Sequence, residues 1–125
     1  MEIEEIGSQK VDASLKVRKA LGPGLLESAY QTCLTYELRN RGLEVKTEVD
    51  QPIQYGGLSP DCGYRIDMVI QDVILIENKS VEKLLPVHQA QLLTHLRLRD
   101  IRLGYLINWN VPLIKDGIRR MVNNL

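Results

Sequence analysis

The chain has 125 residues, of which 44% are hydrophobic, and its 16 Lys and Arg residues balance 16 Asp and Glu residues. This length allows one domain with a hydrophobic core, and no apolar run approaches membrane-spanning length. The net charge of zero argues against a general nucleic-acid coat, although a bound metal and local Arg or Lys can still supply the positive field of a nucleic-acid enzyme. The acidic start is unlike a signal peptide. Cys33 and Cys62 lack metal-type spacing, so we expect reduced thiols in a cytoplasmic protein.

The N-terminal part of the chain is expected to be helical. Residues 1–8 are expected to form a flexible N-terminus, followed by a single domain over residues 9–125. Apolar residues at helical spacing predict a short amphipathic helix over residues 9–21, which ends at Gly22-Pro23-Gly24. A longer helix is predicted over residues 25–41.

Strand patterns follow these helices. Alternating apolar and polar residues predict a strand with one solvated face over residues 43–49. Residues 52–55 either extend this strand or form an edge piece, and residues 56–61 form a turn or short loop. Two apolar, β-branched runs over residues 64–70 and 73–80 predict a hairpin.

The C-terminal part is expected to alternate between helix and strand. Pro86 opens a helix that runs to residue 99, a buried strand covers residues 103–109, and a helix over residues 114–122 closes the chain. The step from the hairpin through the helix to the next strand implies a parallel pair with a right-handed crossover. The fold class is therefore α/β, with a mixed sheet between layers of helices.

Three charged residues interrupt the apolar strands of the hairpin: Asp67, Glu77 and Lys79. An unpaired buried charge is costly, and hard cations such as Mg²⁺ bind carboxylate oxygens. A divalent metal is therefore a good reason for two carboxylates in these strands.

The length of the hairpin loop decides whether the two carboxylates share a face. A two-residue loop pairs Ile70 with Val73 and puts Asp67 and Glu77 on opposite faces. A three-residue loop, or one bulge, pairs Ile70 with Ile74 and puts both carboxylates on one face. We predict the second arrangement, because the chemistry requires it and bulges are common beside active sites. The alternative is a surface hairpin with solvated charges.

Further polar residues are candidates for the same site. His88, Gln91 and His95 fall on one face of the predicted helix over residues 86–99, where they either line a site or form a polar boundary. The two histidines lie seven residues apart, so they do not form a metalloprotease zinc motif. Glu27 lies at the edge of an apolar helical stripe, where it either serves a site or is simply a favourable first-turn residue.

Several motifs, in their order along the chain, resemble a known family. Asp67, followed by Glu77-Asn78-Lys79 on the next strand, resembles the signature of the PD-(D/E)XK nuclease-like superfamily. Gly24-Leu25-Leu26-Glu27-Ser28-Ala29-Tyr30 resembles the name-giving motif of a small bacterial branch, the GxxExxY proteins. The resemblance covers nearly the whole chain past residue 10. It implies a restriction-endonuclease-like three-layer sandwich, with a mixed central β-sheet flanked by helices.

The resemblance also implies a metal site. Asp67 and Glu77 would bind Mg²⁺ or Mn²⁺, with Glu27 contributing from a helix and Lys79 as the site lysine. The backbone carbonyl of Asn78 can add a ligand, since carbonyl oxygens suit hard cations.

Other residues would contact the substrate. Gln91 matches the glutamine of a Q-x-x-x-Y motif found in exonuclease-like branches, but His95 stands at the tyrosine position. Histidine titrates near neutrality, so a phenol-like role does not transfer. The candidates for phosphate binding are Arg65, Tyr30, His88 and His95.

The sequence thus predicts a metal-dependent nuclease that acts on nucleic acid, DNA more than RNA, without a membrane partner and with a homodimer as one option. One alternative is an endonuclease like the Holliday-junction resolvases, which usually carry a more basic surface. Another is a nuclease-like fold that binds nucleic acid or protein without cutting. A third is a structural domain with a buried salt-bridge network, although buried ion pairs are poor stabilisers.

Overall fold

The computed structural model describes residues 2–60 and 63–125. One mixed sheet of five strands, in the order β1-β2-β3-β4-β5, forms the middle layer. The strands are β1 (Val45–Asp50), β2 (Arg65–Ile70), β3 (Ile74–Lys79), β4 (Leu103–Asn108) and β5 (Ile118–Val122). The helices are α1 (Ile3–Leu21), α2 (Glu27–Asn40), α3 (Pro86–Arg99) and a 3₁₀ turn, η1 (Ile114–Gly117). Among the described residues, each helix is too short or too polar to span a lipid bilayer.

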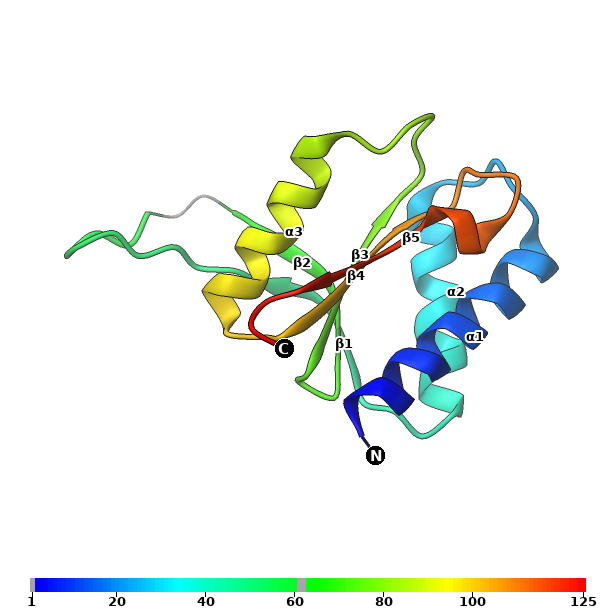
Figure 1. The fold of residues 1–125 in the computed structure, drawn as a ribbon, viewed down its shortest axis with the longest axis horizontal. Coiled ribbons are helices and arrows are strands. Elements are labelled where there is room, and N and C mark those ends of the chain that lie inside the picture. Colours follow the sequence, from blue (N-terminus) through cyan, green and yellow to red (C-terminus); the bar gives the residue numbers. More distant parts are fainter. Residues whose placement is uncertain (1, 61–62) are drawn as a thin grey trace.

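Helices cover both faces of the sheet (Figure 1). α1 and α2 lie on one face, where Leu34 and Leu38 of α2 pack with Met68 and Ile76 of the sheet. α3 lies on the other face, where Leu92 and Leu96 join a second, smaller core. The three-layer α/β sandwich expected from the sequence is confirmed.

The hairpin has the register in which the two carboxylates share a face. Ile70 pairs with Ile74 and Met68 with Ile76, so β2 and β3 are joined by a three-residue loop. The loop closes through positive φ angles of 55° at Gln71 and 57° at Asp72. Because side chains alternate along strands, this register directs Asp67 and Glu77 to the same face. The parallel pairing of β3 with β4 is also confirmed.

The first helix begins earlier than the sequence pattern predicts. α1 starts at Ile3 rather than at residue 9, so residues 3–8, which were expected to be flexible, are helical. The reason is packing, because Ile6 is buried in the main core and Gly7 lies against the Tyr105 hydroxyl. Ile3 and Ile6 continue the hydrophobic spacing of the helix, but the acidic residues between them, Glu4 and Glu5, make this segment look like a solvated terminus in the sequence.

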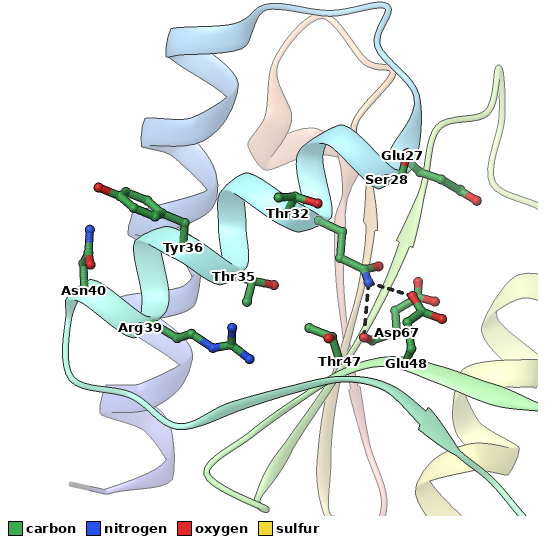
Figure 2. A pocket seen from close by; sticks show the side chains of 11 residues that line it. Glu27, Ser28, Thr32, Thr35, Tyr36, Arg39, Asn40, Thr47, Glu48 and Asp67 are labelled. Carbon is green, nitrogen blue, oxygen red and sulfur yellow. Dashed lines mark hydrogen bonds between the residues drawn. The ribbon is translucent and has the colours of Figure 1, made fainter.

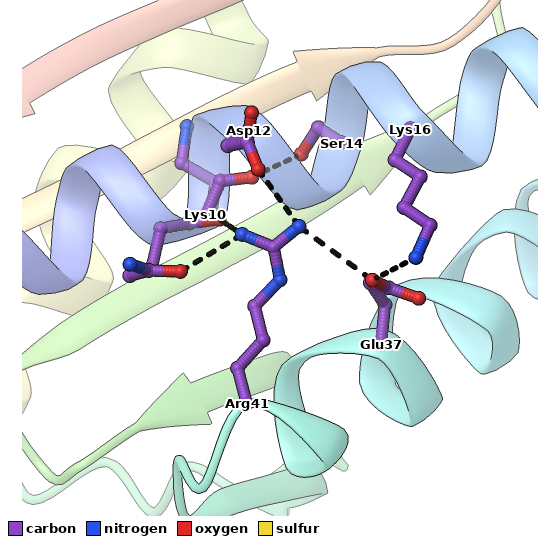
Figure 3. A network of polar contacts seen from close by, with 7 residues as sticks. Lys10, Asp12, Ser14, Lys16, Glu37 and Arg41 are labelled. Atoms are coloured by element: carbon purple, nitrogen blue, oxygen red, sulfur yellow. Dashed lines mark hydrogen bonds and ion pairs between the residues drawn. The ribbon is translucent and has the colours of Figure 1, made fainter.

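Polar contacts join α1 to α2 at the surface (Figure 3). One Arg41 guanidinium lies 2.8 Å from the Asp12 carboxylate of α1, 3.5 Å from Glu37 and 2.8 Å from the Gln9 side-chain oxygen. Under the same helix, the buried Lys10 ammonium lies 3.3 Å above the Tyr105 ring. Burial lowers the pKa of Lys10 to about 7. α1 is therefore held to the rest of the fold along its length.

The predicted C-terminal helix over residues 114–122 is wrong. The segment forms η1 and then strand β5, which pairs antiparallel with β4 from Leu103 to Ile107. β4 is buried along its whole length and needs a hydrogen-bonding neighbour on its second edge. This demand outweighs the weak helical spacing of the segment.

Two smaller expectations also need comment. Residues 52–55 do not extend β1; they lie in a projecting arm, in which Tyr55 bridges to Leu58 (Figure 1). Cys33 is a half-buried free thiol, and Cys62 lies outside the described residues.

Replacing Gly117 by Ala should destabilise the fold by about 1–3 kcal/mol, the usual cost of overpacking. An added Cβ at Gly117 would collide with the Asn108 backbone carbonyl and lie 2.9 Å from the Val111 side chain. Gly57→Ala is the matched control, because an added Cβ there meets nothing within 4 Å. Chemical denaturation measures both variants, and equal stabilities would contradict the packing of η1 against β4.

Candidate functional site

Most of the residues singled out from the sequence surround one cleft of about 210 Å³. We call this space the carboxylate cleft. β2 and β3 supply one wall and α3 supplies the other. Its lining residues are Tyr64, Arg65, Asp67, Glu77, Lys79, His88, Gln91 and His95.

Asp67 is half-buried at the point where β2 and β3 separate. Its Oδ2 accepts a 2.7 Å hydrogen bond from the Asn78 backbone N–H, so the carboxylate replaces a strand partner. Burial, and next the nearby Glu77 carboxylate, raise the pKa of Asp67 to about 7. Glu48 raises the pKa of Asp67 further, while the Asn78 hydrogen bond and Lys79 lower it. The site therefore holds two carboxylates that repel each other.

Glu77 is held from the opposite wall by His95. The Glu77 Oε1 and His95 Nδ1 atoms lie 2.9 Å apart, and the side chains are only 10% and 14% exposed. A carboxylate oxygen accepts hydrogen bonds, so the contact suits the tautomer in which His95 carries a proton on Nδ1. His95 therefore fixes the orientation of Glu77.

The remaining predicted residues of the cleft are less constrained. Lys79 is half-buried and has no ion pair within the described part of the chain. The Arg65 Nε lies 3.5 Å from an Asp50 carboxylate oxygen, and both side chains are largely exposed. His88 Nδ1 accepts a 3.0 Å hydrogen bond from the Leu85 N–H at the start of α3. Gln91 is exposed at the rim of the cleft.

Two predicted residues lie outside the carboxylate cleft. Glu27 is the exposed first residue of α2 and lines a neighbouring groove. Tyr30 is fully buried, and its ring stacks on Trp109 at 4.8 Å. Its hydroxyl donates to the Gly22 carbonyl at 2.6 Å and accepts from the Leu25 N–H at 3.2 Å. The assignment of Tyr30 to phosphate binding is therefore corrected: Tyr30 fixes the loop that precedes Glu27.

Sequence reasoning missed Gln31 and Glu48. The Gln31 amide donates to Glu48 at 2.8 Å and to the Asp67 backbone carbonyl at 3.4 Å, and it accepts from the Asn78 amide at 3.2 Å. Glu48 adopts a φ of 50° within β1, next to Asp67 on the neighbouring strand. The only sequence signals were the four-residue spacing of Gln31 from Glu27 and the polar position of Glu48 in an alternating strand.

The donor atoms of the cleft suit a hard divalent cation. Mg²⁺ commonly binds one or two carboxylates and fills its other positions with water and substrate oxygens. Asp67 and Glu77 offer two such carboxylates, and a cation between them would relieve their repulsion. No group of three or more His, Cys, Asp or Glu side chains within residues 2–60 and 63–125 is close enough to hold a metal alone. The residues therefore fit a cation that keeps open positions.

A comparison with protein families gives a match over residues 4–121 to a model described as the PD-(D/E)XK nuclease superfamily. This range includes every predicted site residue. No curated protein and no solved structure matches the chain significantly. The match agrees with the superfamily indicated by the sequence motifs, while the GxxExxY branch remains a prediction.

Replacing Tyr30 by Phe should lower the free energy of unfolding by about 1–3 kcal/mol, because two backbone groups of the Gly22–Leu25 loop lose their partner. Tyr55→Phe is the control, since the Tyr55 residue is 79% exposed. Urea denaturation measures stability and a labelled oligonucleotide measures binding. Unchanged stability with weaker oligonucleotide binding would restore a substrate role for Tyr30.

Replacing Asp67 by Asn should stabilise the metal-free protein, and the gain should grow as pH rises from about 4 to about 7. In this window the unfolded Asp67 has lost its proton near 3.8, whereas the folded Asp67 keeps it up to about 7. Rising pH therefore destabilises the wild type relative to a variant that cannot ionise at this position.

Thermal unfolding in EDTA across this pH range tests the prediction. Asp116→Asn, at an exposed position in η1, is the control and should show no such trend. A gain that shrinks between pH 4 and 7 would mean that the folded protein lowers the pKa of Asp67.

Proposed function

The chain belongs to the PD-(D/E)XK nuclease superfamily, and we propose on this premise that it is a metal-dependent nuclease that hydrolyses phosphodiester bonds, in DNA rather than RNA. The observation that carries the proposal is the meeting of Asp67, Glu77 and Lys79 in one cleft. Two carboxylates and an ammonium group are a suitable set for holding a cation beside a phosphate.

In this proposal Asp67 and Glu77 hold Mg²⁺ or Mn²⁺, with the Asn78 backbone carbonyl as a third ligand. When bound, the metal supplies Lewis acidity and lowers the pKa of a coordinated water. The Asn78 N–H fixes the carboxylate of Asp67 at 2.7 Å, and His95 fixes that of Glu77 at 2.9 Å. Both ligands therefore have one oxygen restrained by the protein and the other available.

Lys79 is proposed to stabilise the charge that grows on the phosphate oxygens in the transition state. It suits this role because it is half-buried beside the carboxylates and has no competing ion pair among the described residues. Glu27 is proposed to hold a water molecule of the metal from the neighbouring groove, since it does not line the cleft itself.

Substrate contacts fall to the rim of the cleft. Arg65 is the candidate phosphate clamp, because its bond to Asp50 is long and exposed and so costs little to break. Gln91 and His88 are proposed to position water or phosphate from α3. His95 acts through Glu77 and is a positioning residue.

A second function remains in view because no three metal-binding side chains gather within the described residues. On this alternative the cleft binds nucleic acid, or a protein partner, without cutting. This alternative gives Asp67, Glu77 and Lys79 no chemical role. It is the weaker one, because clustered carboxylates destabilise a fold that has no cation to bind.

Titration with Mg²⁺ or Mn²⁺ should raise the melting temperature of the wild type and switch on cleavage of labelled single-stranded, duplex or branched DNA. Asp67→Asn should abolish both effects together, because it removes a metal ligand. Lys79→Met should keep the metal-linked rise in melting temperature and reduce the cleavage rate by about 10²–10³, the typical effect of removing one charge-stabilising group.

Asp116→Asn controls for a general loss of negative charge and should behave like the wild type. Cleavage that survives in Asp67→Asn, or a wild type that does not respond to metal, would remove the nuclease proposal. Metal-linked stabilisation without cleavage of any substrate would favour the binding alternative.

A further inference from the structure

A second and larger cavity, of about 870 Å³, lies between α2 and β1 and shares Asp67 with the carboxylate cleft (Figure 2). We call it the α2 groove. Its size is in the range of ligand-binding cavities. Its lining residues are Glu27, Ser28, Gln31, Thr32, Thr35, Tyr36, Arg39, Asn40, Thr47, Glu48 and Asp67. None of these residues is aliphatic, so the groove offers hydrogen bonds and one aromatic ring rather than apolar pockets.

One face of α2 forms the floor of the groove. Ser28, Thr32, Tyr36 and Arg39 recur every three or four residues and therefore lie on one side of the helix. The face extends for about 16 Å from Ser28 to Arg39, at the usual rise of an α-helix. The groove is thus long and polar, which suits an extended chain of repeating polar units.

Tyr36 lines the groove at its end far from Asp67, and Figure 2 shows its ring directed outward from α2, at the rim of the groove. It is 66% exposed on a helix whose other aromatic residue, Tyr30, is fully buried. Arg39 follows Tyr36 by three residues on α2 and uses one N–H group to donate to the Val45 carbonyl at 2.7 Å. Its other N–H groups have no ion-pair partner in the described part of the chain. An exposed aromatic ring and a cation at the same end of a groove are the usual groups for binding an unpaired base and a phosphate of its strand.

Thr35 carries a buried hydroxyl that has no protein partner among the described residues. Its side chain lines the groove and the residue is only 7% exposed, yet its hydroxyl has no hydrogen-bond partner within residues 2–60 and 63–125. Figure 2 shows Thr35 directed from α2 into the space in front of Thr47. Buried hydroxyls are nearly always hydrogen-bonded, so this one is available to a polar group of a ligand, which would take the place of a water in the free protein.

Charge is distributed unevenly along the groove. Glu27, Glu48 and Asp67 gather at one end, and Arg39 lies at the other with Tyr36 (Figure 2). A polyanion would bind first at the end that carries Arg39 and Tyr36. It would approach the acidic end only where a cation on Asp67 neutralises it.

We propose that the α2 groove binds a single-stranded segment of nucleic acid, with an unpaired base on Tyr36, a phosphate on Arg39, and the strand leading to Asp67. This proposal rests on the proposed function and adds its substrate class. An intact duplex is excluded from this mode, because stacking on Tyr36 needs a base with a free face. A peptide is less suitable, because the groove has no aliphatic pocket for its side chains.

The test is fluorescence anisotropy with labelled oligothymidine in EDTA, which prevents metal-dependent cleavage and leaves binding at the end of the groove that carries Tyr36 and Arg39. Tyr36→Ala should weaken single-strand binding by about tenfold, the usual effect of removing one stacking ring, whereas Tyr36→Phe should bind like the wild type. Thr35→Val should weaken binding several-fold without loss of stability, because the hydroxyl has no partner in the free protein. Tyr55→Ala is the matched control, since Tyr55 is also largely exposed, at 79%, but lies on the projecting arm, and it should bind like the wild type.

The proposal is overturned if Tyr36→Ala binds the oligonucleotide like the wild type, or if a duplex of the same length binds more strongly. It is also overturned if no oligonucleotide binds, which is the result that a peptide-binding groove would give. The result is separable from the proposed function. If oligonucleotide binding depends on Tyr36 but the protein cleaves no substrate, the proposal for the α2 groove stands and the nuclease proposal is overturned. If Tyr36→Ala changes neither cleavage nor oligonucleotide binding, the nuclease proposal stands and the proposal for the α2 groove is overturned.

Discussion

The repulsion between Asp67 and Glu77, across the separating ends of β2 and β3, is the constraint on which the site depends. Partial burial strengthens this repulsion, because the surroundings screen charge less than water does. One hydrogen bond restrains each carboxylate. The Asn78 backbone N–H lies 2.7 Å from the Asp67 Oδ2 atom, and the His95 Nδ1 atom lies 2.9 Å from the Glu77 Oε1 atom. Neither restraint separates the carboxylates. The arrangement therefore lowers the stability of the metal-free protein, as the proposed cation site would require.

Asn78 connects this constraint to the hydrophobic core. Its backbone binds Asp67, and its buried amide accepts from the Trp109 indole at 3.0 Å and donates to Gln31 at 3.2 Å. Trp109 in turn stacks on Tyr30, which fixes the loop before α2. The relative position of β3 and α2 is thus set by directional contacts as well as by apolar packing. A shift of α2 would therefore change the position of Asp67, because Gln31 and Asn78 connect the two by hydrogen bonds.

The sequence predicted what depends on local pattern. The hairpin register followed from strand alternation and from the need to bring Asp67 opposite Glu77, and the parallel β3–β4 pair followed from a single helical crossover. The failures depend on contacts between distant segments. Residues 118–122 became a strand because β4 needed a partner, and Tyr30 became a core residue because Trp109 packs against it. Glu48 could not be recognised, because its place beside Asp67 requires a φ of 50° that no local pattern reveals.

The zero net charge of the chain is consistent with a site that is divided into the carboxylate cleft and the α2 groove. A nuclease that wraps a duplex needs many basic contacts with the phosphates, and its affinity then depends steeply on salt. The α2 groove offers one Arg, one exposed Tyr and a series of hydroxyl and amide groups, with three carboxylates at its Asp67 end. Stacking and neutral hydrogen bonds are screened little by salt, so the share of strand binding that these groups supply does not depend on a basic surface. Within residues 2–60 and 63–125, Asp67 alone lines both the groove and the cleft, so it is the residue where the proposed strand binding and the proposed chemistry of the carboxylates would meet.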